Sequence, residues 1–276
     1  MKIIGLITVV VCGAVLIYFT ADFPAWSDPN SPASTHLSPY YIEHTMEDTS
    51  VPNIVTAVLA DYRGYDTMYE TAVIFTAGLA CFFLLRMQRD REPAWHLYRH
   101  LPTSITIRIE KGGRLPKSSA VFRRIDSHWI PEDLIIKNTC RFLLPFIQLF
   151  ALYVVAHGHH SPGGGFQGGV ILGAAVILYA ISHDLRGALS RLKEKSAALF
   201  SGTGVLLYAG TGTICILLGA EFLNYSALAQ LLGTDAVTAR SHGILIVEIG
   251  VAIAVMSVMV WIYYNLSSMG AQDEGL

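Results

Sequence analysis

The chain has 276 residues, of which 53% are hydrophobic and only 14% are charged, and its mean hydropathy is +0.46. Soluble domains carry about 25% charged residues, so this composition excludes an ordinary soluble protein and predicts an integral membrane protein. The formal net charge of −2 gives no general attraction to nucleic acid. The four cysteines form no Cys-x-x-Cys pair, so no disulfide framework, zinc site or iron–sulfur cluster is indicated.

Apolar segments long enough to cross a bilayer recur along the whole chain. About 20 such residues span a hydrocarbon core of roughly 30 Å, and because lipid offers the backbone no hydrogen bonds, each segment is expected to be a helix. The first is predicted to be an uncleaved anchor, since no clean signal-peptidase site follows it. We therefore predict an all-α membrane protein with about six transmembrane helices: Ile3–Thr20, Thr67–Leu85, Leu134–Ala156, Gly165–Ser182, Ala197–Ala220 and Gly243–Leu266.

Basic residues predict the orientation and divide the chain. Ten Lys or Arg residues lie between Arg86 and Arg124, and four more follow the fourth segment, so both loops are expected in the cytoplasm with both termini inside. We predict a two-helix module at residues 1–92, a basic cytoplasmic linker at 93–132 and a four-helix module at 133–276. The linker is expected to be a solvated face, with Trp95, Tyr98 and Trp129 as alternative headgroup contacts.

The second predicted helix begins near a cluster of carboxylates, "VLADYRGYDTMYETAVIF". One helix from Asn53 to Leu85 would be about 50 Å long, too long for a normal span, so a break near Gly64 is expected. Thr67 and Glu70 fit a helix capping box, which is one interpretation of Glu70. The alternative is that nearby polar residues face a hydrated path for protons or sodium. The residues proposed for that path are Asp61, Arg63, Asp66 and Glu70.

Two cations begin the third predicted helix, on one face at a spacing of four residues. Lys137 can extend to the headgroups, whereas Arg141 lies deeper and is expected to pair with a carboxylate of another helix or subunit. Lys137 and Arg141 are therefore candidates for a buried ion pair.

The stretch "HGHHSPGGGFQGGVILG" joins the third and fourth predicted helices. Its G-x-G-x-x-G run lacks the preceding strand of a dinucleotide site, and no Gly-Lys-Ser/Thr follows to make a phosphate loop. The histidines have no Cys, Asp or Glu neighbour that would complete a metal site. Ser161, Gly165, Gly169 and Gly173 recur every four residues, which predicts a close helix-packing face. The predicted hairpin and packing motif comprises His157, His159, Pro162, Gly163, Gly164, Gly165, Phe166, Gln167, Gly169 and Gly173.

That motif has a second interpretation. Gln167 and the histidines are expected at a membrane edge, where they would help water or ions enter the protein. Glu248 lies inside the sixth predicted helix without a basic neighbour in sequence, so it must find water, a proton or a partner. The carboxylate of Glu248 could therefore take part in an ion path, or it could form a hydrogen bond to another helix.

Two parts of the chain resemble known membrane proteins. The run "RFLLPFIQLFALYVVAHGHHSPGGGFQGGVILGAAVILYAIS" is similar to the MnhB/MrpB family of multisubunit Na⁺/H⁺ antiporters, over roughly Leu134 to Leu266. The run "YYIEHTMEDTSVPNIVTAVLADYRGYDTMYETAVIFTAGLACFFLL" resembles the E-type component of membrane-bound hydrogenases and the C-terminal end of the large antiporter protein MrpA. The resemblance implies a fusion of the two modules. It also implies that carboxylates at the positions of Asp61 and Glu70 take part in cation or proton transfer.

These observations predict a non-redox membrane subunit in the cell membrane of a prokaryote. It would belong to an Mrp-type antiporter or to the ion-translocating arm of a hydrogenase-like, complex I-related respiratory complex. Its partners would be large antiporter-like subunits and small helical subunits in the lipid bilayer. It would bind no metal or cofactor itself, and the transported species would be Na⁺, H⁺ or both. The alternatives are a structural scaffold, or a haem-bearing anchor whose axial ligands would be drawn from the histidines near His157.

Overall fold

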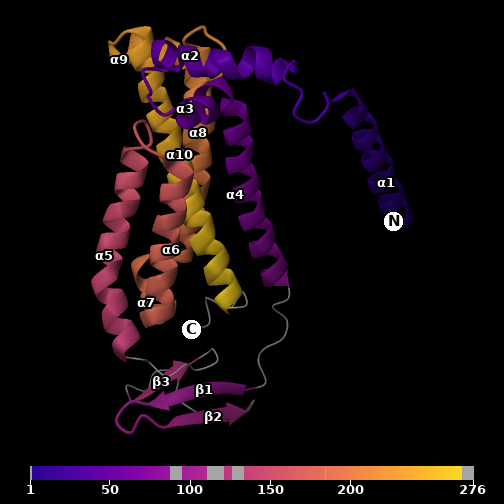
Figure 1. Cartoon of the computed structure of the whole chain (residues 1–276). Helices are drawn as coiled ribbons and strands as arrows, with labels where there is room; N and C mark the ends of the chain where they lie inside the picture. Colours follow the sequence, from indigo (N-terminus) through magenta and orange to yellow (C-terminus); the bar gives the residue numbers. More distant parts are fainter. Residues whose placement is uncertain (1, 88–94, 111–120, 126–133, 184, 269–276) are drawn as a thin grey trace. The chain divides into compact units, whose positions relative to one another are not determined.

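The computed structural model (Figure 1) describes residues 2–87, 95–110, 121–125, 134–183 and 185–268, and the chain divides into two compact units, Met1–Thr45 and Met46–Leu276. Among these residues, six helices are long and apolar enough to cross a membrane, in agreement with the number predicted. The mostly helical membrane fold is therefore confirmed. The candidate spans run Ile3–Asp22, Gly64–Leu85, Leu134–Ala156, Gly165–His183, Glu194–Leu217 and Ala236–Ser268.

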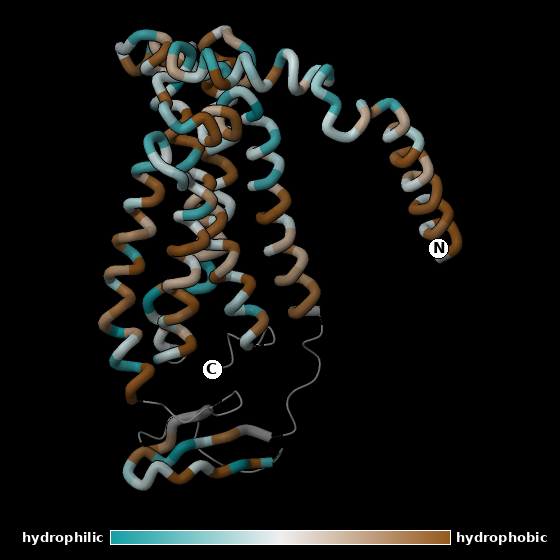
Figure 2. Tube along the Cα trace, viewed as in Figure 1, coloured by the Kyte–Doolittle hydropathy of each residue, from teal (hydrophilic) through white to brown (hydrophobic). Residues whose placement is uncertain are grey.

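The first unit contains one candidate span and a short polar segment. Helix α1 covers Lys2–Phe19, and its apolar side chains are exposed within the unit, as expected of a helix whose surroundings are lipid. Figure 2 shows hydrophobic residues along most of this helix. The 3₁₀ turn η1 (Thr20–Asp22) and the π-helical turn η2 (Ala33–Leu37) follow, and α2 (Ser38–Thr49) crosses into the second unit.

The break predicted near Gly64 is present. Helix α3 (Ile54–Ala57) continues into a π-helical turn, η3 (Val58–Tyr62), before Arg63 leaves helical geometry with φ −121° and ψ 36°. Helix α4 (Gly64–Met87) then begins at the glycine. Single π-turns inside helices often mark functional positions, because they displace one residue from the regular hydrogen-bond ladder.

A small sheet in the predicted linker was not expected. Strands β1 (Trp95–His100), β2 (Thr106–Glu110) and β3 (Phe122–Ile125) pair antiparallel in the order β2-β1-β3, with Tyr98 opposite Ile107 and Arg124. The high charge of the segment led to the expectation of a plain solvated linker. The alternation in "TIRIE" is the strand signal that this expectation overlooked.

The second unit is built around its last helix. Helix α10 (Ala236–Ser268) packs on α4, α6 (Gly165–His183) and α8 (Glu194–Leu217), while α5 (Leu134–Ala156) packs mainly on α6. The short helix α7 (Leu185–Arg191) follows α6, and η4 (Tyr225–Leu228) with α9 (Ala229–Leu232) connects α8 to α10. Helix α10 is therefore the buried centre onto which the other spans pack.

Helix α10 begins at Ala236, before the predicted start at Gly243. Asp235 accepts a hydrogen bond from the Thr238 N–H at 3.0 Å, which stabilises the first turn, and this bond lowers the pKa of the Asp235 carboxyl. The polar first turns were not included in the prediction because only apolar length was considered. They carry Arg240, which forms an ion pair with Asp61.

Small residues set the distance between α6 and α10. A Cβ atom on Gly165 would lie 2.0 Å from the carbonyl oxygen of Glu248, and one on Gly169 would lie 2.7 Å from that of Ala252. The glycine face expected on this helix therefore lies against α10. Ser161 is not part of that face, because α6 begins only at Gly165 and the Ser161 hydroxyl donates to the His157 carbonyl.

The compact units do not divide the chain where the sequence did. The boundary follows Thr45, and helix α4 packs on α10 and α8 within the larger unit. The division into modules at residues 92 and 132 remains a prediction.

Candidate functional site

The centre of the candidate site is the side chain of Glu248, which is 8% exposed and lies within the glycine turn between α5 and α6. A Cβ atom on Gly158 would come 2.9 Å from Glu248 Oε2, and one on Gly164 would come 2.5 Å from Oε1. Gly164 has φ +133°, a backbone conformation that residues other than glycine rarely adopt. The turn therefore needs glycine partly to make room for a carboxylate from another helix.

A cavity of about 500 Å³ opens beside this carboxylate. Its lining includes Glu70, Gln167, Tyr208 and Glu248, together with apolar side chains of α3, α4 and α10. Glu248 Oε2 is buried and has no hydrogen-bond partner among the described residues. Because an unsatisfied buried oxygen is costly, this atom is suited to a bound proton, a cation or water in the cavity.

Asn53 holds the glycine turn in place. Its side-chain Nδ2 donates to the carbonyls of Gly158 at 2.7 Å and Ser161 at 2.8 Å, and its backbone N–H donates to the carbonyl of His159 at 2.9 Å. Thr56 also donates to the carbonyl of Gly158, at 2.8 Å. Asn53 was not among the predicted site residues, because nothing in the local sequence distinguishes a simple helix N-cap from an N-cap that also binds a turn 105 residues away.

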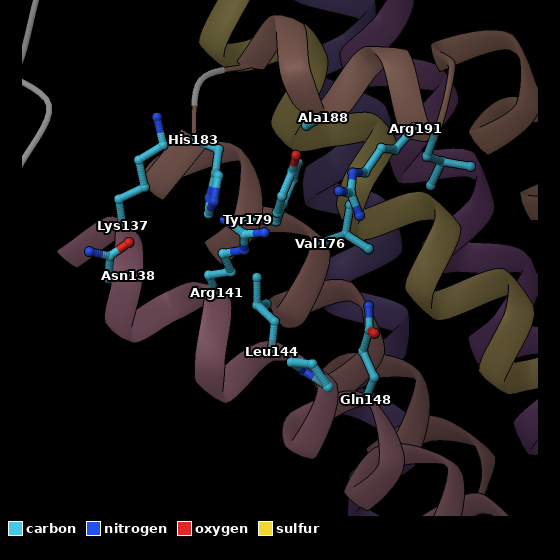
Figure 3. Close-up of a pocket in the computed structure, with 12 residues that line it drawn as sticks. Lys137, Asn138, Arg141, Leu144, Gln148, Val176, Tyr179, His183, Ala188 and Arg191 are labelled. Atoms are coloured by element: carbon cyan, nitrogen blue, oxygen red, sulfur yellow. The ribbon is translucent and has the colours of Figure 1, made fainter. Parts of the chain in front are cut away.

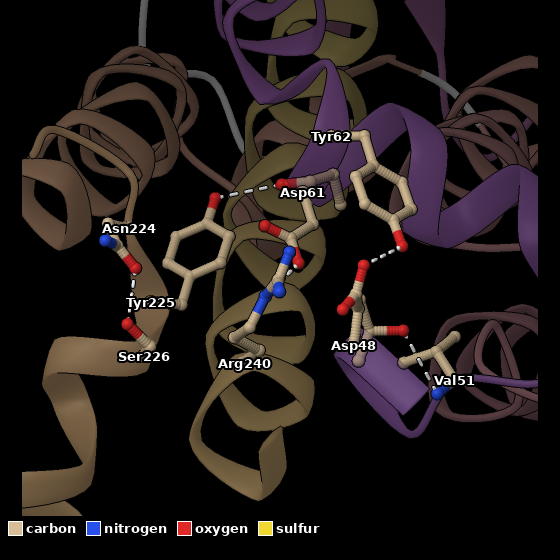
Figure 4. A network of polar contacts seen from close by, with 10 residues as sticks. Asp48, Val51, Asp61, Tyr62, Asn224, Tyr225, Ser226 and Arg240 are labelled. Atoms are coloured by element: carbon tan, nitrogen blue, oxygen red, sulfur yellow. Dashed lines mark hydrogen bonds and ion pairs between the residues drawn. The ribbon is translucent and has the colours of Figure 1, made fainter. Parts of the chain in front are cut away.

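A buried ion pair joins the π-turn to α10. Arg240 Nε donates to Asp61 Oδ2 at 2.7 Å, and the Asp61 side chain is only 7% exposed (Figure 4). Burial raises the pKa of Asp61, and the hydrogen bond from Arg240 opposes that change only in part. Asp61 was predicted as an ion-path residue beside Arg63, but its partner is Arg240, which no local pattern in the sequence indicated.

Two tyrosines connect the surroundings of Glu248 and Asp61. Tyr208 donates to the carbonyl of Gly64 at 2.8 Å, and Tyr225 donates to the carbonyl of Ala60 at 3.0 Å. Both hydroxyls lie within 3.8 Å of the position that a Cβ atom on Gly64 would occupy, so they are neighbours. A second cavity of about 380 Å³, lined by Asp61 and Arg240, lies against the same segment.

The other carboxylates of the predicted path lie nearer the surface. Asp66 pairs with Arg63, and both side chains are about half exposed. Glu70 is exposed but lines the larger cavity. The capping interpretation of Glu70 is wrong, because α4 begins at Gly64 and the Thr67 hydroxyl donates to the carbonyl of Leu59 at 2.8 Å.

The histidines lie on the turn itself. His157 and His160 are exposed, and the His157 ring stacks on Tyr153. His159 is half-buried, and burial, followed by the charges of His160 and His242, lowers its pKa. Among the residues that the structure describes, no three His, Cys, Asp or Glu side chains gather closely enough to hold a metal ion.

Some of the other members of the predicted hairpin motif border the same cavity. Phe166 and Gly163 line it, and Pro162 is exposed in the turn. The motif therefore forms a turn and a packing face, as predicted from its glycines, and it also borders the cavity beside Glu248.

Lys137 and Arg141 do not form part of this site. They line a separate hollow at the beginning of α5, where Lys137 is half-buried and Arg141 is exposed within this chain. No ion pair of Arg141 occurs among the described residues, so its expected carboxylate partner is not found within this part of the chain.

The six candidate spans and their polar interior define a multi-pass membrane protein. Residues 135–261 match the model of a domain related to the MnhB subunit of Na⁺/H⁺ antiporter, and residues 3–98 match the MbhE model, which describes a component of MBH. The chain is 31% identical over 131 residues to the B-type protein of the Na⁺/H⁺ antiporter of Bacillus subtilis, covering 91% of that protein and 45% of this one. The chain belongs to the MnhB-related family of antiporter subunits.

Longer relatives and solved complexes cover both modules. The chain is 25% identical over 203 residues to a probable K⁺/H⁺ antiporter protein of the A/B type from Rhizobium meliloti, spanning 74% of this chain but only 19% of that one. It shares the fold of a chain in an archaeal membrane-bound sulfane sulfur reductase, with a TM-score of 0.58, 24% identity and coverage of 96% and 97% of the two chains. A chain of the Mrp complex from Dietzia gives a TM-score of 0.58 at 23% identity, covering 97% of this chain and 26% of that one. The relatives that these comparisons name are therefore subunits of ion antiporters, and the solved structures are chains of multisubunit membrane complexes.

Proposed function

We propose that the chain contributes a proton or cation path to a multisubunit antiporter or related membrane complex, with Glu248 as its central carrier. The observation that supports this proposal most directly is the Glu248 carboxylate, which is buried beside a cavity with one oxygen unpartnered among the described residues. A carboxylate in that position can exchange a proton or bind a cation without breaking an existing ion pair.

The path would run from Glu70 to Glu248 and then towards Asp61. Glu70 is at the exposed side of the cavity, and Glu248 is at its buried side. The neighbouring hydroxyls of Tyr208 and Tyr225 stand beside the segment that carries Asp61. Tyr208 lines the larger cavity together with Glu70 and Glu248. Water in the two cavities would complete the connection between these groups.

We propose that the transported species is Na⁺, H⁺ or both, which the relation to Na⁺/H⁺ antiporter subunits supports, and that this chain itself binds no cofactor. We propose that the driving force comes from partner subunits, as an existing ion gradient in an antiporter or as redox chemistry in a respiratory complex. The likeness to a chain of a sulfane sulfur reductase complex supports the second arrangement at the level of the fold.

The test is Glu248→Gln in the complete complex, reconstituted in vesicles with a fluorescent reporter of the pH gradient. We expect most of the cation-dependent dissipation of the gradient to be lost while the subunits still co-purify. Glu194→Gln is the matched control, because Glu194 is equally buried but accepts a hydrogen bond from Trp261 Nε1 at 3.2 Å. Normal transport by Glu248→Gln would exclude Glu248 from the path.

A scaffold role is the second candidate, and the bonds of Asn53 to the glycine turn favour it because they tie the two family-matched regions together. If the chain is only a scaffold, the complete complex should transport ions normally when Asp61→Asn, Glu70→Gln and Glu248→Gln are combined. The proposed path predicts that this triple variant is inactive.

A further inference from the structure

A basic hollow lies at one end of α5, α6 and α7, apart from the proposed path. It has a volume of about 450 Å³, and the basic residues that line it are Lys137, Arg141, His183 and Arg191 (Figure 3). Its lining in the described part of the chain includes no Asp or Glu. Arg141 and Arg191 place two permanent positive charges at this hollow, which favours an anionic occupant.

The arginines reach the hollow from two different helices. Arg141 lies on α5, and Arg191 at the end of α7 rests 4.6 Å above the ring of Tyr179. Tyr179 also stacks on His183, with ring centroids 4.5 Å apart and an interplanar angle of 16°. Stacking fixes the plane of a guanidinium and leaves its N–H edge free to donate, which suits the tetrahedral oxygens of a phosphate group.

The hollow changes from polar to apolar along the helices. Lys137 is in the first turn of α5 and His183 is the last residue of α6, so these polar groups lie at helix ends. Leu144, Pro145 and Val176 lie further inside both spans and also line the hollow. A free phosphate ion would make no use of this apolar part, whereas a lipid has an acyl chain to place beside it.

We propose that this hollow binds the phosphate headgroup of an anionic phospholipid, with Arg141 and Arg191 as its principal ligands and the first part of an acyl chain along Leu144 and Val176. The basic residues predict that this end faces the cytoplasm, where anionic headgroups attract basic pockets between transmembrane helices. The lipid would occupy a position that the proposed ion path does not use.

The experiment is native mass spectrometry of the full chain in detergent, titrated with phosphatidylglycerol. Arg141→Gln combined with Arg191→Gln should weaken lipid binding roughly ten- to hundredfold, since each basic group contributes a factor of about three to ten. The matched control is Lys193→Gln combined with Lys195→Gln, which removes two exposed charges nearby without changing the lining of the hollow. Arg141→Lys should retain most of the binding, because it keeps the charge.

Three results would overturn the proposal. Equal losses in the two double variants would mean that surface charge alone attracts the lipid. Equal competition by inorganic phosphate and by phosphatidylglycerol would identify a free-anion site instead of a lipid site. Loss of the lipid on assembly with partner subunits would mean that a partner's acidic group fills the hollow. Circular dichroism of each variant checks that a loss of binding does not come from misfolding.

Discussion

Gly164 and Glu248 are in direct contact, although they lie on different sides of a helix–helix interface. A Cβ atom on Gly164 would approach Glu248 Oε1 to 2.5 Å, and the backbone there has φ +133°. The glycine turn and the buried carboxylate therefore form one structural unit. Each residue restricts what the other position can accommodate.

Gly164→Ala tests that unit. The substitution adds a strained backbone and a collision with the carboxylate, so the full chain in detergent should lose about 2–4 kcal/mol of unfolding free energy. Gly219→Ala is the control, because Gly219 has φ +85° but nothing within 4 Å of its Cβ position. This control should lose only about 1 kcal/mol.

Glu248→Ala should reduce the cost of Gly164→Ala in a double-mutant cycle. Additive effects of the two substitutions would show that the contact has no energetic importance.

Asn53→Ala tests the attachment of the turn. It removes the donor to the carbonyls of Gly158 and Ser161. That loss should cost about 2–4 kcal/mol in denaturant unfolding of the full chain. Asn138→Ala is a suitable control, since Asn138 is exposed at the surface of α5. A stability change for Asn53→Ala no larger than that of the control would contradict the proposed clamp.

The stability of the chain should depend on the protonation of Asp61. Burial raises the pKa of its carboxyl above the ordinary value of 3.8, so the folded chain binds this proton more tightly than the unfolded chain. The contribution of this proton to the free energy of unfolding is then fully present below pH 3.8 and is lost as the pH rises through the folded-state pKa of Asp61. The stability of the native chain relative to Asp61→Asn should therefore fall as the pH is raised from strongly acidic towards neutral.

Asp235 provides the control of opposite sign. Hydrogen bonds from Thr238 lower the pKa of Asp235, so its contribution is present above pH 3.8 and is lost as the pH falls through the folded-state pKa. Chemical unfolding of the native chain, Asp61→Asn and Asp235→Asn across this range measures both slopes. Slopes of the same sign would show that the Arg240 hydrogen bond outweighs the burial of Asp61.

Close packing of α8 on α10 gives a fourth prediction. A Cβ atom on Gly204 would lie 2.5 Å from the carbonyl oxygen of Gly250 and 2.6 Å from the Ala254 nitrogen. Gly204→Ala must separate these backbones and should cost about 1–3 kcal/mol of stability in thermal unfolding. Gly210 lies on the same helix with nothing within 4 Å of its Cβ position. Gly210→Ala should instead stabilise the chain by about 0.5–1 kcal/mol. The two variants should therefore change the melting temperature in opposite directions.

Part of the site could be predicted from the sequence because its signals are local. The break near Gly64 follows from segment length. The need of Glu248 for water, a proton or a partner follows from its position as a carboxylate within an apolar run. The π-turn at Val58–Tyr62 and the sheet β1–β3 were missed, because neither interrupts the pattern of charge and apolar length on which the predictions depended. Whether the carboxylates carry ions remains a prediction.

The number of spans and the carboxylates within or beside them could be predicted from the amino-acid sequence, because both depend on runs of neighbouring residues. The partners of these residues follow from the folded arrangement alone: Arg240 for Asp61, the glycine turn for Glu248, and Asn53 for that turn. These partners are separated by many tens of residues in the chain. They meet through the packing and rotation of helices against one another, which a local pattern of residues does not specify.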